Sequence, residues 1–343
     1  MEYTLLLWPH ANARYQTQMR KLALSELELM LRRIAPEAVA HMDEAFDLPG
    51  LIIESAEPLN ERAIAAVKNH SLLYGLFERR SDGLLKPVTG RADAFLGADM
   101  PAILKYKGKT NEMFLQLLIN AALYSGDYWN ETCISFFDPM CGRATAPFIA
   151  LNRGWNAVGA DVDRADLREA EKFCKRYCEY HHFKHNMIRQ SRTVRGGKPV
   201  PVIRFDVART PEDFKAGRTV CLSLAELDAA KSGEAFGKAE FHLIACDLPY
   251  GVAHDAQIGK AVPKGKNWLE ALLQRALPGW HRLLKPGGTA AVSFNAQTFR
   301  RDRLRDLLAD AGFTPLTGGP FDGFEHWVEQ AITRDIVVAR KEP

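Results

Sequence analysis

The most distinctive segment of the chain places an acid, a proline and an aromatic side chain together, in the order Asp247-Leu248-Pro249-Tyr250-Gly251. The apolar run before it, residues 241–246, predicts a buried strand that ends in a turn. Open α/β sheets bind ligands at the carboxyl ends of their strands. We therefore expect these side chains to face a binding crevice.

The chemistry that this segment suits is alkylation of an amine whose lone pair is delocalised into an aromatic ring. Hydrogen bonds from the amine to the Asp247 carboxylate and the Leu248 carbonyl would draw the lone pair out of conjugation. Pro249 would fix the direction of that carbonyl, and Tyr250 would offer a face on which a flat base stacks. Taken alone, the segment equally suits an ordinary turn with a buried tyrosine, and only its place in a sheet favours catalysis.

Three further acids close predicted strands upstream of this segment. Asp138 follows residues 133–137, and Gly142 shortly after it would let the backbone approach a ligand. Free amides of the next helix would favour a carboxylate or phosphate. Asp161, about twenty residues on, would accept hydrogen bonds from two ribose hydroxyls. Asp206 would accept from an adenine amino group.

A dinucleotide site is the competing interpretation of the loop at Gly142. Its G-x-G-x-x-G fingerprint becomes Gly142-x-Ala144-x-x-Pro147 here, which departs at two positions. A proline where helix and strand should pack closely argues against pyrophosphate, and adenosine with a methionine tail fits better. The residues that we predict to bind this cofactor are Asp138, Pro139, Cys141, Gly142, Thr145, Asp161, Val162, Asp206 and Val207.

Strands and helices alternate from residue 133 onward. Strands are expected at 133–137, 156–161, 202–206, 241–247, 289–294 and 332–339, with helices at 144–152, 164–183, 268–284 and 302–311. One helix with irregular chain is expected over 210–238. Such alternation implies parallel strands with right-handed crossovers, and therefore a doubly wound, Rossmann-like α/β sheet.

The first hundred residues mix short strands with helices. Strands are expected at 3–8, 51–54 and 71–77, and helices at 16–34 and 60–68. We therefore predict a smaller N-terminal α+β domain over residues 1–100, which is a candidate RNA-binding unit. A connecting helix within residues 101–130 would lead into the doubly wound domain over residues 131–343.

The bulk composition is that of a globular chain. The 343 residues suggest two domains, with 47% hydrophobic and 25% charged residues. A net charge of +3 permits a nucleic-acid partner without requiring one. The six cysteines do not resemble a secreted disulfide framework, no signal peptide is expected, and no apolar run could span a bilayer. We expect a reduced, cytoplasmic compartment.

Metal-ligand side-chain types gather near the end of the helix expected over 164–183. They are Cys174, Cys178, His181, His182 and His185. Side chains along a single helix face cannot surround a tetrahedral zinc ion with four ligands. We therefore predict no metal site.

Four ordered motifs resemble those of class I S-adenosylmethionine-dependent methyltransferases: D-P-M-C-G-R-A-T, G-A-D-V-D, D-L-P-Y-G and L-L-K-P-G-G. The resemblance covers residues 105–343. The first and third motifs are similar to the subfamily that methylates the exocyclic amine of guanine in RNA, which includes the THUMP-associated tRNA guanine-N2 methyltransferases and their ribosomal RNA relatives. Two positions depart from the pattern. Ala144 replaces a glycine, so its methyl group would crowd the cofactor, and Leu248 stands where proline is usual.

The resemblance implies S-adenosylmethionine as cofactor and RNA, in particular tRNA, as partner. It also implies that Thr110 and Asn111 lie near the cofactor. The residues with implied catalytic roles are Asp247, Leu248, Pro249 and Tyr250. Two other functions stay open. A DNA adenine-N6 or cytosine-N4 methyltransferase shares the acid-x-proline-aromatic pattern, and a catalytically silent fold could bind nucleic acid or a partner protein.

Overall fold

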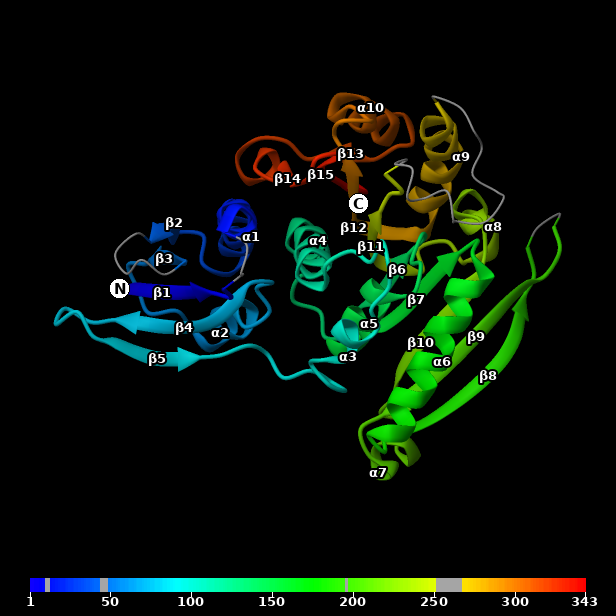
Figure 1. Cartoon of the computed structure of the whole chain (residues 1–343), viewed down its shortest axis with the longest axis horizontal. Coiled ribbons are helices and arrows are strands. Elements are labelled where there is room, and N and C mark those ends of the chain that lie inside the picture. The colour runs from blue at the N-terminus through cyan, green and yellow to red at the C-terminus, as the bar shows by residue number, and fades with distance from the viewer. Residues whose placement is uncertain (10–12, 44–48, 195–196, 251–266) are drawn as a thin grey trace.

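A computed structural model of the chain describes residues 1–9, 13–43, 49–194, 197–250 and 267–343. It contains two sheets, a five-stranded sheet near the N-terminus and a ten-stranded sheet in the rest of the chain (Figure 1). The predicted domain boundary at residue 100 falls between them. The elements of the first part are β1 (Glu2–Leu7), α1 (Ala13–Ile34), β2 (Val39–Asp43), β3 (Gly50–Glu54), α2 (Glu61–Val67), β4 (Leu73–Arg79) and β5 (Leu85–Thr89).

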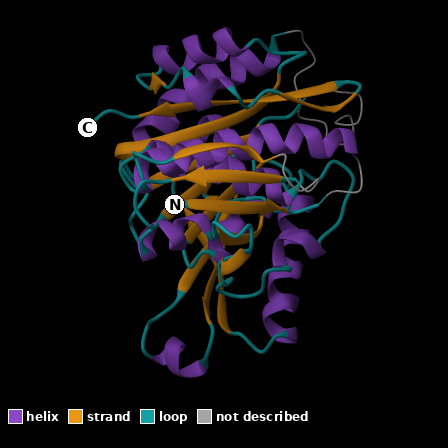
Figure 2. Cartoon of the chain, turned by 90° about the vertical axis from the view of Figure 1, so that its left-hand side faces the viewer, coloured by secondary structure: helices purple, strands orange, loops and turns teal. Residues whose placement is uncertain are grey.

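The N-terminal part, nearest the viewer in Figure 2, is an antiparallel sheet in the order β2-β3-β1-β4-β5. The element order β-α-β-β-α-β over β1–β4 is that of a ferredoxin-like unit. Alternate residues of β1, namely Tyr3, Leu5 and Leu7, are buried in the hydrophobic core, and Thr4 on the opposite face of the strand is buried as well. Helix α1 also packs against α4, which belongs to the second part.

The second part begins with two helices and then alternates strands with helices. Its elements are α3 (Met100–Ile103), α4 (Glu112–Ser125), β6 (Ser135–Asp138), α5 (Thr145–Asn152), β7 (Asn156–Asp161), α6 (Arg164–Tyr180), β8 (Lys184–Arg192), β9 (Val200–Ala208), α7 (Pro211–Lys215), β10 (Val220–Glu226), η1 (Ala229–Lys231), α8 (Ser232–Ala235), β11 (Phe241–Asp247), α9 (Trp268–Leu283), β12 (Leu284–Asn295), α10 (Arg301–Asp310), β13 (Thr314–Pro315), η3 (Gly319–Asp322), β14 (His326–Glu329) and β15 (Ile332–Arg340).

The large sheet has the order β13-β15-β12-β11-β6-β7-β10-β9-β8, and β14 pairs with β15. The five central strands, β12 to β10 in this order, run parallel to one another. The prediction of a Rossmann-like α/β sheet is confirmed. The strand order reverses between β6 and β11, and a ligand crevice is expected at such a switch point, outside the carboxyl ends of the strands. In the described parts of the chain, no helix is both long and apolar enough to cross a membrane.

The third parallel strand is not the one expected. The predicted strand 202–206 lies in β9, which runs antiparallel to β8 and to β10. The true third strand, β10, lies in the stretch where only a helix and irregular chain were expected. Strand β8 was missed because its residues are mostly polar, so no period of two marks it in the sequence.

This reversal moves Asp206 and Val207 away from the predicted cofactor site. Asp206 pairs with Cys221 at the start of β10, whereas Glu226 at the end of β10 pairs with Asp161. Since Asp161 marks the carboxyl edge of the parallel strands, Asp206 lies at the opposite edge. The prediction that Asp206 and Val207 contact the cofactor is therefore wrong.

Candidate functional site

The loop after β6 is tied to the carboxyl end of β7. The Gly142 amide donates a 2.8 Å hydrogen bond to Asp161 Oδ2, and the Asp163 amide donates one of 2.8 Å to Asp161 Oδ1. Gly142 has a φ of +52°, and a Cβ atom placed there would meet no other atom within 4 Å. Glycine is thus favoured by the backbone conformation, and the space beside it is open to a ligand.

The neighbouring Ala144 does not project into that open space. Its φ is 64°, its amide donates to the Cys141 carbonyl at 2.8 Å, and the residue is buried within the hydrophobic core. The predicted crowding of the cofactor by this methyl group is therefore not what the structure shows. Thr145, which begins α5, is also buried and is hydrogen-bonded to Tyr106. Tyr106 in turn lies 4.5 Å from the Arg143 guanidinium.

Three carboxyl groups converge at this edge of the sheet. Asp138 is buried and accepts a 3.0 Å hydrogen bond from the Met140 amide. Burial raises the pKa of Asp138 well above its usual value, and the charges of Asp161 and Asp247 raise it further. Burial likewise raises the pKa of Asp161. Carboxylates held together in this way favour a cationic ligand, which would offset both burial and mutual repulsion.

Asp247 at the end of β11 is held by two hydroxyl groups from different parts of the chain. Thr110 Oγ1 donates to its Oδ2 at 2.5 Å, and the Tyr250 hydroxyl donates to its Oδ1 at 2.5 Å. Leu248 is buried, and its amide donates to the Ser293 carbonyl on β12 at 2.9 Å. This bond continues the β11–β12 pairing and fixes where the segment leaves the sheet.

Tyr250 is anchored by Arg334 of β15. Arg334 Nε donates to the Tyr250 hydroxyl at 2.5 Å, and its guanidinium lies 5.2 Å from the Tyr250 ring and 4.2 Å from the Phe114 ring. Burial and the charge of Asp247 raise the pKa of Tyr250 well above its usual value. Tyr250 is thus a neutral donor to Asp247. Its role as a stacking surface for a base stays a prediction.

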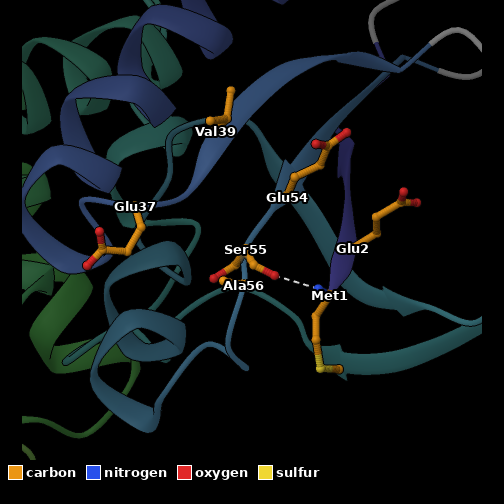
Figure 3. A pocket seen from close by; sticks show the side chains of 7 residues that line it. All are labelled: Met1, Glu2, Glu37, Val39, Glu54, Ser55 and Ala56. Atoms are coloured by element: carbon orange, nitrogen blue, oxygen red, sulfur yellow. Dashed lines mark hydrogen bonds between the residues drawn. The ribbon is translucent and has the colours of Figure 1, made fainter.

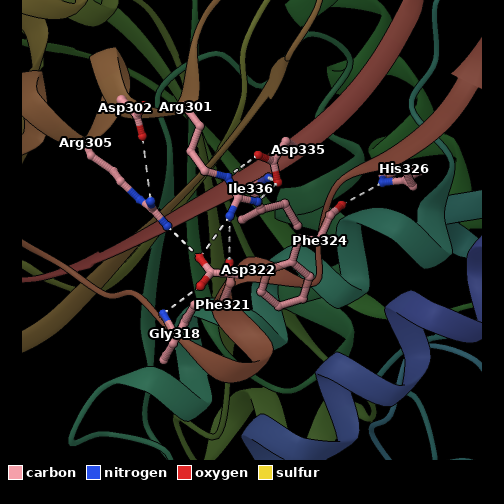
Figure 4. A network of polar contacts seen from close by, with 10 residues as sticks. All are labelled: Arg301, Asp302, Arg305, Gly318, Phe321, Asp322, Phe324, His326, Asp335 and Ile336. Carbon is pink, nitrogen blue, oxygen red and sulfur yellow. Dashed lines mark hydrogen bonds and ion pairs between the residues drawn. The ribbon is translucent and has the colours of Figure 1, made fainter.

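A polar network behind the site holds β15 in place (Figure 4). The fully buried Asp335, next to Arg334, receives two hydrogen bonds from Arg301 of α10, one of them 2.5 Å long at Nε. Arg301 also contacts Asp322 at 3.1 Å. Because both oxygens of Asp335 are engaged, the strand cannot rotate or slide without breaking a buried ion pair, and Arg334 keeps its position on Tyr250.

His326 packs beside this network. Its ring lies 5.3 Å from Phe114, and its Nδ1 donates to the Phe324 carbonyl at 2.9 Å. Burial lowers the pKa of His326 to about 4, so the ring is neutral at physiological pH. Neither Arg334 nor His326 was a sequence candidate. Each lies on the C-terminal strands, far along the chain from the segment that it supports, and no local pattern marks it.

The remaining predicted residues have different surroundings. Thr110 contacts Asp247, whereas Asn111 caps α4 by accepting from the Met113 and Phe114 amides at 2.8 and 3.2 Å. Val162 is exposed beside Asp161. Gly251 lies outside the described residues. Pro139 belongs to the loop between β6 and α5, at the same edge of the sheet.

Glu226 was missed by the sequence analysis, although it closes the true third strand. It lies opposite Asp161 and forms an ion pair with Arg164 at 3.5 Å. The Leu227 amide donates to the Asp161 carbonyl at 2.9 Å, which brings the segment after β10 to the same edge. The apolar run Val220–Ala225 before the acid was the signal that could have identified β10.

The side chains of metal-ligand type near the end of α6 are not gathered. Cys174 and Cys178 are buried in the core, whereas His181 and His182, which follow the helix, are exposed. Over the ranges that the structure describes, no three His, Cys, Asp or Glu side chains are placed to hold a metal ion.

No family model matches the chain, and no curated protein matches its sequence. Similar solved structures include a TehB-like SAM-dependent methyltransferase from Corynebacterium glutamicum, with 15% identity over 61% of this chain and 80% of that chain and a TM-score of 0.33. A SAM-dependent methyltransferase from Methanosarcina mazei has 14% identity over 62% and 95%, with a TM-score of 0.38.

A third similar structure is magnesium protoporphyrin IX methyltransferase from Synechocystis, solved with bound SAM. It has 13% identity over 70% of this chain and 89% of that chain, with a TM-score of 0.36. These likenesses are remote. Any assignment of activity to this chain must therefore come from its own site residues.

Proposed function

We propose that this protein is a SAM-dependent methyltransferase that acts on an exocyclic amine of a nucleobase in RNA, and that guanine N2 of tRNA is its substrate. One observation carries the proposal. The Asp247 carboxyl group is held by Thr110 and Tyr250 at the carboxyl end of β11, within electrostatic reach of Asp138 and its glycine loop. An acceptor for an amine hydrogen therefore lies near a group of carboxyl groups that suits a cationic cofactor.

The residues of the crevice fit S-adenosylmethionine. The open space at Gly142 allows a ligand to approach the backbone, and the Asp161 oxygens keep lone pairs for ribose hydroxyls. The convergence of Asp138, Asp161 and Asp247 favours a molecule with positive charge, such as a sulfonium. When bound, the cofactor supplies an electrophilic methyl group.

The Asp247 carboxyl group can still receive an amine. A carboxylate offers about four lone-pair positions, and Thr110 and Tyr250 occupy two of them. An amine hydrogen bonded to a remaining position, with the second hydrogen on the Leu248 carbonyl, would localise the nitrogen lone pair for attack. The nitrogen loses one proton as it gains the methyl group, and Asp247 or water accepts that proton. The rest of the catalysis is alignment of the two reactants.

The RNA assignment is supported by the likeness of D-P-M-C-G and D-L-P-Y-G to the guanine-N2 subfamily. An exocyclic amine of a DNA base could bind the same Asp247 carboxylate. An experiment must therefore distinguish RNA from DNA as the substrate. The protein is incubated with tritiated S-adenosylmethionine and total tRNA, ribosomal RNA or DNA, and the labelled nucleosides are separated. Label in N2-methylguanosine is the expected result.

The other outcomes each reject part of the proposal. Label confined to methyladenine or methylcytosine of DNA would reject RNA as the substrate while keeping the enzyme class. If the protein binds S-adenosylmethionine but labels none of the nucleic acids, the proposed activity is rejected. That outcome would favour a catalytically silent binding fold. The variant Asp247→Ala serves as the control for label that does not depend on the site.

A further inference from the structure

The positive charge of the chain is concentrated in one segment. Residues 181–210 contain seven lysine and arginine residues and a single acid, Asp206, whereas the whole chain has a net charge of only +3. Residues 1–100 contain eleven basic and fourteen acidic residues. The excess of basic residues that a nucleic-acid partner requires therefore lies in residues 181–210 and not in the N-terminal part.

The N-terminal sheet offers an acidic hollow instead. A pocket of about 430 Å³ at one end of that sheet is lined by Glu2, Glu37 and Glu54 (Figure 3). Three carboxylates around one hollow repel phosphate groups. This face of the N-terminal part is thus a poor place to hold an RNA backbone.

This basic segment forms the hairpin β8–β9 at the edge of the large sheet (Figure 1). Its turn points toward the cofactor edge, because Arg192 pairs with Val200 at the turn, and Val202 pairs with Ala225 of β10. The residue after Ala225 is Glu226, which lies opposite Asp161. A polymer bound along the turn end of the hairpin would therefore pass beside the crevice.

A small cavity lies between this hairpin and α6. Its volume is about 150 Å³, and its charged lining consists of Arg164, Arg168 and Arg189 with Glu171 and Glu226, so basic side chains outnumber acidic ones there. Its floor is apolar and includes Leu167 and Ile203. Pockets that enclose drug-sized ligands begin at about 300 Å³, so this one has room for a phosphate group and not for a nucleotide.

Existing ion pairs do not block the arginines. Arg164 pairs with Glu226, and because neither side chain is buried this pair contributes little free energy. Arg189 pairs with the buried Glu171, but its own side chain is 64% exposed. Arg168 is exposed on α6, and Lys198 is exposed in the turn region of the hairpin. Phosphate oxygens could therefore replace the Arg164–Glu226 contact at small cost, and they could reach the exposed side chains of Arg168, Arg189 and Lys198 without breaking the pair with the buried Glu171.

We propose that the basic face formed by Arg164, Arg168, Arg189 and Lys198 binds the phosphate backbone of the RNA substrate. This inference rests on the proposed function, because it assigns the docking surface for the same methyl acceptor. The face positions the RNA through backbone charge, and base recognition is left to the residues around Asp247.

The test compares charge reversals in the two parts of the molecule. The variants are Arg168→Glu and Lys198→Glu on the basic face, with Lys86→Glu on β5 as the matched control, since the Lys86 side chain is 63% exposed. Binding of unfractionated tRNA is measured over a range of salt concentrations. Each variant of the basic face should weaken binding about 3–10-fold and reduce the salt slope by about 1, whereas the control should not.

The readouts separate this inference from the proposed function. Unchanged affinity and salt slope in Arg168→Glu and Lys198→Glu would overturn the docking surface, as would an equal loss in Lys86→Glu. Preferential binding of duplex DNA through the basic face would overturn RNA as the docked partner. If the wild-type protein transfers no methyl group to any RNA, the proposed activity fails, and the binding measurements still decide whether this face holds the RNA. Binding of S-adenosylmethionine should be unchanged in all three variants.

Discussion

The acids on the two sides of the crevice are held in different ways. Asp138 and Asp161 accept hydrogen bonds from backbone amides within their own loops or the adjoining one. Asp247 instead accepts from the side-chain hydroxyls of Thr110 and Tyr250, and Thr110 is 137 residues away in the sequence. The proposed cofactor side is therefore built from backbone geometry, and the proposed acceptor side from side-chain contacts, one of which joins distant parts of the chain.

This difference has a functional consequence. A backbone amide cannot leave its acceptor unless the loop moves, so Asp138 and Asp161 are fixed before any ligand binds. A hydroxyl can rotate, so the partners of Asp247 can adjust when an amine arrives. We expect changes on the cofactor side to affect affinity for S-adenosylmethionine, and changes on the acceptor side to affect the rate of methyl transfer.

Replacement of Asp247 by Ala should slow methyl transfer without weakening cofactor binding, and it should produce the largest effect. The rate of methyl transfer should fall by about 10²–10⁴-fold, because the group that orients the amine is lost. The affinity for S-adenosylmethionine should stay within about threefold, since a carboxylate that does not hold the cofactor directly adds little. Single-turnover rates and calorimetric binding measure the two quantities. A rate close to that of the wild type would defeat the mechanism.

Replacement of Asp161 by Asn should weaken S-adenosylmethionine binding by about 10–100-fold, the value of one hydrogen bond to a charged group. The matched control is Asp206→Asn, because Asp206 lies at the opposite edge of the sheet and pairs with Arg204 at 2.7 Å. Calorimetry on both variants is the measurement. Equal losses in the two would contradict the reassignment of the third strand.

Removal of either hydroxyl that holds Asp247 should have a smaller effect. Thr110→Val and Tyr250→Phe each delete one hydrogen bond to a carboxylate, and we expect kcat to fall about tenfold in each. The dissociation constant of S-adenosylmethionine should not change. If Thr110→Val weakens cofactor binding without slowing transfer, Thr110 belongs to the cofactor side, as the sequence resemblance implied.

The pH dependence of stability should show the smallest effect. Burial raises the pKa of Asp138 above its ordinary 3.8, so the folded state keeps a proton that the unfolded chain has lost. This contribution is complete below 3.8 and disappears as pH rises through the folded pKa. The Tm difference between wild type and Asp138→Asn should therefore grow in favour of the variant from acid to neutral pH. Stabilisation by S-adenosylmethionine should rise over the same range, and a flat difference would contradict the buried, raised pKa.

The strands next to the proposed cofactor site could be predicted because their signals are local. The strands Asn156–Asp161 and Phe241–Asp247 have the predicted bounds, since an apolar run that ends in an acid and a turn is visible in a few consecutive residues. Gly142 has a φ of +52°, which glycine adopts readily, and its approach to the cofactor stays a prediction.

The direction of β9 could not be predicted from local sequence. A short apolar strand looks the same whether it runs parallel or antiparallel to its neighbours, and the polar strand β8 concealed the hairpin that reverses the chain. Asp206 was assigned to the wrong edge for this reason. The basic face could not be predicted for the same reason. Its charges come from α6 and from the hairpin β8–β9, which the sequence pattern did not predict.

The sequence alone determined the sheet class, the switch-point loops and the two acids that end β7 and β11, because these depend on periodicity and turn residues within short windows. Tertiary structure alone decided which partners hold Asp247, that Arg334 anchors Tyr250, and where the positive charge gathers. Those features join residues far apart in the chain. Only the packing of the sheet, α4 and the C-terminal strands brings their side chains within hydrogen-bond distance.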